Sequence, residues 1–283
     1  MTRVAIVCVL AGLACAGAAW ASPVPVTERA SAGTLAIEFT YHLDKATEDF
    51  ERRYTHMHLK ILRADVALID ADVPRLCPGC STWPSSGGDP ASSSVRARDL
   101  DGDGEPEAML DLYTGGAHCC LYTTFFRYAA GQYVRRVHSW SNPGYRMRDV
   151  GSDGRPEFIT ADDRFNYAFS CYACSGAPLL VQRYARGKLV NVTRRFPQLV
   201  RADAARWWAT YRKALRVHVP PTGILPTYLA DEYLAGRSAA GWARVRKAVA
   251  RADWAKTAEP RWRNRSNYLK AVRRFLVKTG YVR

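Results

Sequence analysis

The sequence is poor in acidic residues and has no long hydrophobic run after residue 21. Only 26 of its 283 residues are Asp or Glu, against 41 Lys or Arg, which gives a formal net charge of +15. No later segment approaches the roughly 20 apolar residues that a membrane-spanning helix needs, so a polytopic membrane protein is excluded. The serine nucleophile elbow and the phosphate-binding loop are also missing. The sequence therefore offers no motif of a serine hydrolase or of a P-loop nucleotide site.

What is present is the composition of a globular protein. The chain is 48% hydrophobic and 24% charged, and its 20 Gly and 15 Pro are too few for a collagen-like or linker-like chain. Its length allows one large domain or two modest ones.

The first 21 residues have the pattern of a signal peptide. Arg3 supplies the positive charge, residues 4–19 are apolar and small, and Ala19-Trp20-Ala21 is an A-x-A cleavage motif. We therefore expect cleavage after Ala21 and a secreted or periplasmic protein without a transmembrane segment. Such a protein would not meet intracellular nucleic acid.

The cysteines favour disulfides. Cleavage would leave an even number of them in an oxidising compartment, namely Cys77, Cys80, Cys119, Cys120, Cys171 and Cys174. Six cysteines allow 15 pairings, and the sequence cannot choose among them. The pairing we prefer joins Cys119-Cys120 to the hairpin of Cys171 and Cys174, with Cys77 bonded to Cys80. A bond between Cys119 and Cys120, a redox-active Cys77–Cys80 pair and a four-cysteine zinc site are the alternatives.

The charge divides the chain into two parts. Residues 22–199 contain 21 Lys or Arg and 21 Asp or Glu, whereas residues 200–283 contain 19 and 5, a net charge of +14. We place a domain boundary there, between a β-rich domain at 22–199 and a basic α-helical domain at 200–283. Apolar stripes at helical spacing predict helices near 203–217, 226–236, 238–249 and 266–280. The basic part should attract an anionic polysaccharide, a lipid headgroup or another extracellular polyanion.

The first part contains strands and an internal repeat. Alternating patterns predict strands at 34–41, 57–63 and 66–70. Residues 95–107 align with 145–157 at an offset of 50, and Arg127-Tyr128 aligns with Arg183-Tyr184 at an offset of 56. The two units, at about 95–140 and 145–195, each predict four short strands; in the first these are 95–98, 107–113, 123–128 and 133–137. This period is typical of a propeller blade.

An acidic loop within the first unit is the sharpest chemical signal. Asp99, Asp101 and Asp103 occupy positions 1, 3 and 5, with Gly104 at the turn. Glu105 at position 7 would offer its backbone carbonyl, and Glu107 at position 9 a carboxylate. Crowded carboxylates repel one another unless a cation lies among them, and an all-oxygen ligand set suits Ca²⁺. The strand-like sequence that follows the loop excludes an EF-hand.

The run from Asp99 to Glu107 resembles the calcium loop of FG-GAP or VCBS-type repeats of integrin-like β-propellers, over about residues 95–192. The resemblance implies Ca²⁺ bound by Asp99, Asp101, Asp103, Glu107 and the carbonyl of Glu105, in an extracellular adhesion protein. The Phe-Gly and Gly-Ala-Pro signatures of that family are missing. In the second copy Gly151 replaces a carboxylate, so Asp149, Asp153 and Glu157 would form a weaker second site or serve only as a turn, and the turn is the favoured interpretation.

These observations predict an α+β protein, with blade-like repeats of a partial or degenerate β-propeller followed by a helical region. The expected function is that of an exported, non-catalytic, calcium-binding adhesion or ligand-binding protein that contacts an anionic envelope or extracellular component. A secreted hydrolase with catalytic carboxylates is the alternative, because such pairs leave no fixed sequence spacing.

Overall fold

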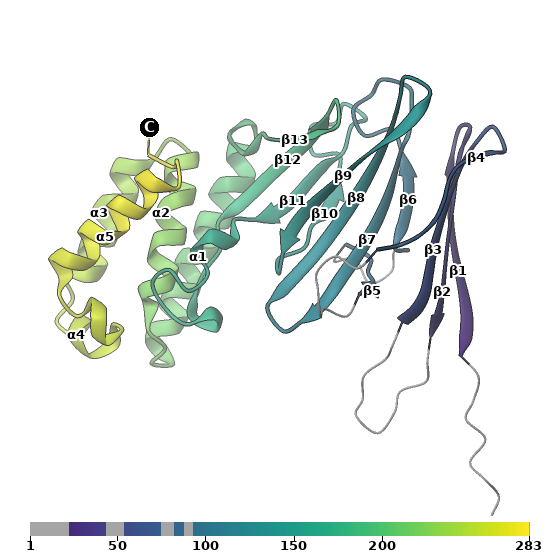
Figure 1. Cartoon of the computed structure of the whole chain (residues 1–283). Coiled ribbons are helices and arrows are strands. Elements are labelled where there is room, and N and C mark those ends of the chain that lie inside the picture. The colour runs from purple at the N-terminus through teal and green to yellow at the C-terminus, as the bar shows by residue number, and fades with distance from the viewer. Residues whose placement is uncertain (1–22, 44–53, 75–81, 88–92, 283) are drawn as a thin grey trace, which may run out of the picture.

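A computed structural model describes residues 23–43, 54–74, 82–87 and 93–282. The expected signal peptide and the Cys77–Cys80 pair lie outside these ranges. Strands occupy the N-terminal two thirds of the described chain and helices the remainder (Figure 1).

The first sheet is an antiparallel meander of strands in sequence order: β1 (Val24–Ala32), β2 (Leu35–Leu43), β3 (Tyr54–Arg63) and β4 (Val66–Asp72). On β2, Leu35, Ile37 and Phe39 are buried in alternation with half-buried residues, because successive side chains of a strand point to opposite faces. The sequence did not predict β1, since its residues are mostly small or polar.

The two repeats form the second and third sheets. The second contains β6 (Val95–Arg98), β7 (Glu107–Gly116), β8 (Cys119–Ala129) and β9 (Gln132–Ser141). The short strand β5 (Trp83–Pro84) also pairs with β7, further along that strand than β6 does. The third contains β10 (Arg146–Arg148), β11 (Glu157–Ala161), β12 (Leu179–Ala185) and β13 (Lys188–Asn191). Arg98 pairs with Glu107, and Arg148 pairs with Glu157. The structure thus repeats the predicted offset of 50.

The three sheets and the helices are stacked in sequence order (Figure 1). One apolar cluster joins the first sheet to one face of the second, through residues such as Phe39, Ile61 and Leu110. Another joins the second sheet to the third, through Phe125, Trp140 and Phe158. The α+β class is confirmed. The described strands form face-to-face layers, however, and do not close into a propeller.

The extra residues of the second repeat hold the helical region in place. They lie between β11 and β12 and include two 3₁₀ turns, η1 (Asp163–Phe165) and η2 (Tyr172–Cys174). Phe165 and Phe169 from this insertion are buried in the helical core. The backbone carbonyl of Phe169 accepts hydrogen bonds from Trp262 Nε1 at 2.9 Å and from Thr222 Oγ1 at 3.1 Å.

The helical region contains α1 (Pro197–Arg216), α2 (Ile224–Leu234), α3 (Ser238–Val249), the short α4 (Trp254–Thr257) and α5 (Arg265–Lys278), joined by three 3₁₀ turns, η3 (Thr193–Arg195), η4 (Pro221–Gly223) and η5 (Pro260–Trp262). The helix α2 lies at the centre, with residues on all its sides buried from Ile224 to Glu232, and α1, α3 and α5 pack around it. The helix α1 begins before residue 203 because Pro197 suits a first helical turn. None of the described helices combines the length and the apolar character that crossing a bilayer requires.

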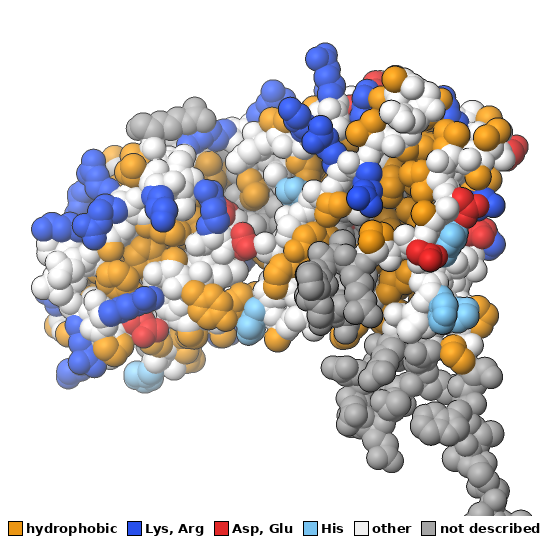
Figure 2. Space-filling model, viewed as in Figure 1, with side chains coloured by type: hydrophobic (Ala, Val, Ile, Leu, Met, Phe, Trp, Pro, Cys, Tyr) orange, Lys and Arg blue, Asp and Glu red, His pale blue; other side chains and the backbone are white. Residues whose placement is uncertain are grey.

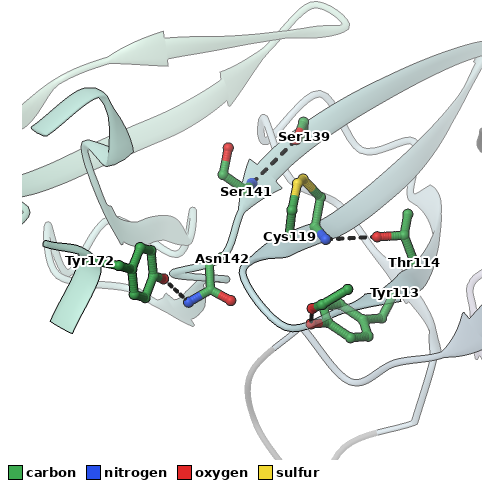
Figure 3. The surroundings of a disulfide bond; sticks show 9 residues. Tyr113, Thr114, Cys119, Ser139, Ser141, Asn142 and Tyr172 are labelled. Carbon is green, nitrogen blue, oxygen red and sulfur yellow. Dashed lines mark hydrogen bonds between the residues drawn. A yellow bond between two sulfur atoms is a disulfide. The ribbon is translucent and has the colours of Figure 1, made fainter. Parts of the chain in front are cut away.

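Two disulfides are formed in the described part of the chain, and both are local. Cys119 is bonded to Cys120 at the β7–β8 hairpin, and Cys171 to Cys174 around η2. The pairing that we preferred, between the two hairpins, is therefore wrong. The two segments nevertheless touch, because His118 of the β7–β8 turn packs on Tyr172 of η2. Asn142, just after β9, also donates a hydrogen bond to the Tyr172 hydroxyl (Figure 3). Thr114 Oγ1 accepts from the Cys120 amide at 2.8 Å.

Candidate metal centre

The predicted acidic loop joins β6 to β7 at one end of the second sheet. Asp99 organises the loop, since its carboxylate accepts hydrogen bonds from the amides of Gly102, at 2.7 Å, and Gly104, at 3.0 Å. Both glycines have positive φ angles, of 78° and 87°, a conformation that side-chain-bearing residues rarely adopt. The Asp-Gly-Asp-Gly sequence therefore forms a tight turn with its carboxylates close together.

The equivalent loop between β10 and β11 repeats most of the hydrogen bonds from backbone amides to carboxylates. Asp149 accepts from the Gly154 amide at 2.9 Å, as Asp99 does from Gly104. Glu107 Oε2 accepts from the Leu100 amide at 3.0 Å, and Glu157 Oε2 accepts from the Val150 amide at 2.8 Å. The two loops therefore share one conformation and differ in the side chains that they bring together.

The first loop brings together three of the five residues predicted as ligands. Oxygen atoms of Asp99, Asp101 and Glu107 all lie within 4.8 Å of one another. The Asp103 carboxylate instead accepts from Arg127 Nη2 at 2.9 Å, and the Glu105 carboxylate pairs with Arg63 of β3. Two acidic side chains of the loop thus already have cationic partners, while the other three face one another.

Two oxygens in this cluster are buried without a hydrogen-bond partner in the described structure, Asp101 Oδ1 and Glu107 Oε1. Glu107 is only 1% exposed. Its nearest cationic atom is Arg127 Nε, at 3.9 Å from Glu107 Oε1. Burial raises the pKa of Glu107 to about 8, and the nearby carboxylates of the loop add to that rise. A buried carboxylate oxygen without a hydrogen-bond partner is costly, so this cluster favours the uptake of a proton or a cation.

In the second loop an arginine supplies the positive charge. Arg183 Nε donates to Glu157 Oε1 at 2.8 Å, its Nη2 pairs with the same oxygen, and its Nη1 donates to Asp153 Oδ2 at 2.8 Å. A Cβ atom on Gly151 would lie 2.9 Å from Arg183 Nη2. The glycine that removes one carboxylate from this loop therefore also makes room for the guanidinium. Asp153 and Glu157 thus pair with an internal cation, whereas Asp149 accepts hydrogen bonds from the amides of Asp153 and Gly154.

The sequence analysis did not predict that arginines would neutralise the loop carboxylates, although the alignment of the two repeats contained the evidence. Arg127 and Arg183 are equivalent positions of β8 and β12, and both follow from the alignment of the two repeats. In the second loop the guanidinium meets two carboxylates, Asp153 and Glu157. In the first, Arg127 makes its hydrogen bond to Asp103 and stays at 3.9 Å from Glu107. The first loop thus holds more negative charge than its arginine neutralises.

The cluster also lies at the contact between two sheets. Asp101 Oδ2 accepts a hydrogen bond from the amide of Arg186, at 2.8 Å, in the β12–β13 turn of the third sheet. A cation held by Asp101 would therefore stiffen the packing of the second sheet on the third as well as the loop itself.

Comparison with known proteins finds a match to a family model other than the one that the loop resembles. The family described as "sll0997 C-terminal domain" matches residues 200–280. A probable thylakoid lumen protein of Synechocystis, sll0997, is 30% identical over 204 residues, which is 66% of this chain and 60% of that protein. An uncharacterized Sinorhizobium fredii protein, y4bJ, is 27% identical over 163 residues, or 56% of this chain and 26% of that protein. The chain thus spans less than two thirds of either relative. No solved structure matches it.

The resemblance to FG-GAP or VCBS repeats is therefore wrong. The family match is to the sll0997 C-terminal domain, and the relatives bear no such name. The physical reason is that the resemblance rests on a nine-residue Asp/Gly turn. A loop of this kind can connect two antiparallel strands in any sheet, and here it joins β6 to β7 and recurs between β10 and β11.

Proposed function

We propose that this chain is an exported, non-catalytic binding protein whose β-layered part is stabilised by one Ca²⁺ ion and whose basic helical part contacts an anionic component outside the cytoplasm. The observation that carries the first half is the pair of buried, unpartnered oxygens, Asp101 Oδ1 and Glu107 Oε1, within a three-carboxylate cluster. Carboxylate oxygens are the ligands that a hard cation such as Ca²⁺ takes.

Comparison of the two repeats supports a single calcium site. In the second loop the Arg183 guanidinium already lies against Asp153 and Glu157, so that loop has no need of an ion. In the first loop Asp99, Asp101 and Glu107 would bind the ion, and Asp103, held by Arg127, would orient the loop. The expected affinity is modest, since extracellular calcium modules have a Kd of about 10⁻⁴–10⁻³ M.

Three observations support export. The first 21 residues have the signal-peptide pattern, which predicts cleavage after Ala21 and a periplasmic or secreted chain. The two local disulfides suit an oxidising compartment. The Synechocystis relative is described as a probable thylakoid lumen protein, and a lumen is also a compartment that exported proteins reach.

The carboxyl groups with strongly raised pKa values favour a binding role over a hydrolase. Groups of this kind are the usual candidates for acid catalysis, and burial raises the pKa of Glu107 to about 8, of Asp111 to about 6 and of Asp231 to about 10. All three side chains are at most 1% exposed, so none of them can reach a substrate. Asp111 is bound by Arg96, Tyr145 and Thr123 within the second sheet.

Calcium should raise the thermal stability of the chain. For a Kd of about 10⁻⁴ M, 5 mM Ca²⁺ stabilises the folded state by about 2 kcal/mol, which corresponds to a midpoint shift of about 5 °C. We expect this shift in residues 22–283 on going from EDTA to Ca²⁺, measured by calorimetry. Asp101→Asn should abolish it, while Asp153→Asn in the second loop should retain it. An equal shift in both variants, or no shift in the parent chain, would show that the first loop is not a calcium site.

A further inference from the structure

The outward face of α5 carries four cations in one stripe. Lys270, Arg273, Arg274 and Lys278 follow at i, i+3, i+4 and i+8, which places them on one side of the helix. All four are exposed, and with Val277 they line a shallow depression of about 410 Å³. The stripe is about 12 Å long at 1.5 Å per residue.

Among the described residues, no acidic side chain pairs with this stripe. The helix α5 contains no Asp or Glu, and within the described ranges the four cations form no hydrogen bond or ion pair. Elsewhere in the same region Arg237 lies 3.2 Å from Glu232, and Arg251 lies 2.8 Å from Asp253. Figure 2 shows the same imbalance over the helical region, where Lys and Arg side chains outnumber acidic ones.

The residues around α5 distinguish between three possible anionic partners: a lipid bilayer, a nucleic acid and a polysaccharide. Tyr268, Val272 and Leu276 are completely buried in the helical core. The helix therefore has no free apolar face to insert into a bilayer, as an interfacial helix must. Its exposed stripe also contains no aromatic side chain on which nucleic-acid bases could stack. The cations stand around a shallow depression lined by their own alkyl stems and by the exposed Val277, and this row of charges best fits a hydrophilic chain that carries its own charges in a row.

We propose that the α5 stripe binds a linear anionic polysaccharide, through its carboxylate or sulfate groups. Arg273 and Arg274 would each offer a planar pair of donors to one such group, and Lys270 and Lys278 would meet the neighbouring charges as point cations. This assignment rests on the proposed function and narrows it, since it specifies the class of the anionic partner and the helix that contacts it.

Heparin and alginate, one sulfated and one uronate polymer, are the probes, and the protein is residues 22–283. The stripe variant carries Lys270, Arg273, Arg274 and Lys278 all changed to Gln. The matched control carries the same change at four exposed cations of α1, Arg201, Arg212, Lys213 and Arg216. We expect the stripe variant to lose at least about tenfold in affinity at low salt. The slope of log Kd against log[NaCl] should fall by about three, because bound cations release counterions. The control should stay within about twofold of the parent.

The outcomes separate this inference from the function on which it rests. If the parent binds heparin or alginate and the stripe variant, with an unchanged circular dichroism spectrum, binds equally well, the α5 assignment fails and an anionic partner remains. Equal losses in both variants would mean a diffuse charge effect and would also overturn it. Binding to phosphatidylglycerol vesicles but to neither polysaccharide would overturn this assignment and would indicate that the anionic partner is a membrane. No binding to any of these probes would remove the anionic partner altogether.

Discussion

Replacing Arg183 by Met should be one of the most destabilising single changes in the β-layered part. The substitution keeps much of the side chain's length and removes its charge. It leaves Glu157 fully buried without the guanidinium that now contacts its Oε1 atom. Removal of one partner of a buried ion pair costs about 3–5 kcal/mol. We expect a loss of this size in the free energy of unfolding, measured in urea.

Two further variants show whether the loss comes from the buried charge. Arg155→Met removes another arginine that contacts Asp153, but that side chain is 42% exposed, so we expect a loss below about 1 kcal/mol. The double variant Arg183→Met/Glu157→Leu removes both charges and should recover much of the stability. If Arg183→Met alone were as mild as Arg155→Met, the guanidinium would not be the internal cation of the second loop.

The second large effect is a pH dependence centred on Asp231 of α2. This side chain is completely buried, and its two carboxyl oxygens have no hydrogen-bond partner of normal distance and angle within the described structure. Burial, together with the neighbouring Asp203 carboxyl of α1, raises the pKa of Asp231 from 3.8 to about 10. The nearby backbone of Leu179 offsets only part of this rise in pKa. Protonated Asp231 can donate a hydrogen bond to Asp203, which already accepts from Arg206 and from Trp207 Nε1, at 2.9 Å in both cases.

The sign of the effect follows from the raised pKa. Because the folded state holds the proton more tightly than the unfolded chain, the stabilisation is complete below about pH 4 and is lost as the pH rises towards 10. Asp231→Asn retains the donor and cannot ionise. Relative to the parent, this variant should therefore gain about 3–4 kcal/mol in unfolding free energy between pH 4 and pH 7.

Urea titrations of both chains at a series of pH values measure this difference, and Asp253→Asn is the control. Asp253 is exposed, and Arg251 lowers its pKa, so its effect has the opposite sign: any stabilisation is present at neutral pH and lost on acidification. A difference between parent and Asp231→Asn that did not change with pH would mean that Asp231 is ionised in the fold.

Much of the local structure could be predicted from the sequence because it depends on local patterns. Alternation and turn residues located the strands of the first repeat, and apolar stripes located α1, α2, α3 and α5. The strand β1 was missed since its sequence is mostly small and polar, and its order comes from pairing with β2 along its whole length. The disulfide pairing was wrong because it depends on how two hairpins approach each other, which no local pattern records.

The candidate site was likewise predictable where it depends on local sequence, and not where it depends on tertiary contacts. The Asp/Gly spacing correctly placed a tight loop between two strands, but it could not show which carboxylates would find arginine partners. Arg63 and Arg127 reach Glu105 and Asp103 from other strands, and such contacts depend on tertiary structure. The match to the sll0997 C-terminal domain was not foreseen for a related reason: it covers residues 200–280, where the sequence offered composition and no motif.

Isothermal titration calorimetry with Ca²⁺ tests the central claim most directly, on the parent chain and on two equivalent variants. Asp99→Asn and Asp149→Asn change matching residues of the two loops, each of which accepts a hydrogen bond from the glycine amide five residues later. The account predicts one ion bound per parent chain, no binding to Asp99→Asn, and unchanged binding to Asp149→Asn. Absence of heat from the parent, or equal binding by both variants, would contradict it and would indicate that Arg127 closes on Glu107 as Arg183 does on Glu157.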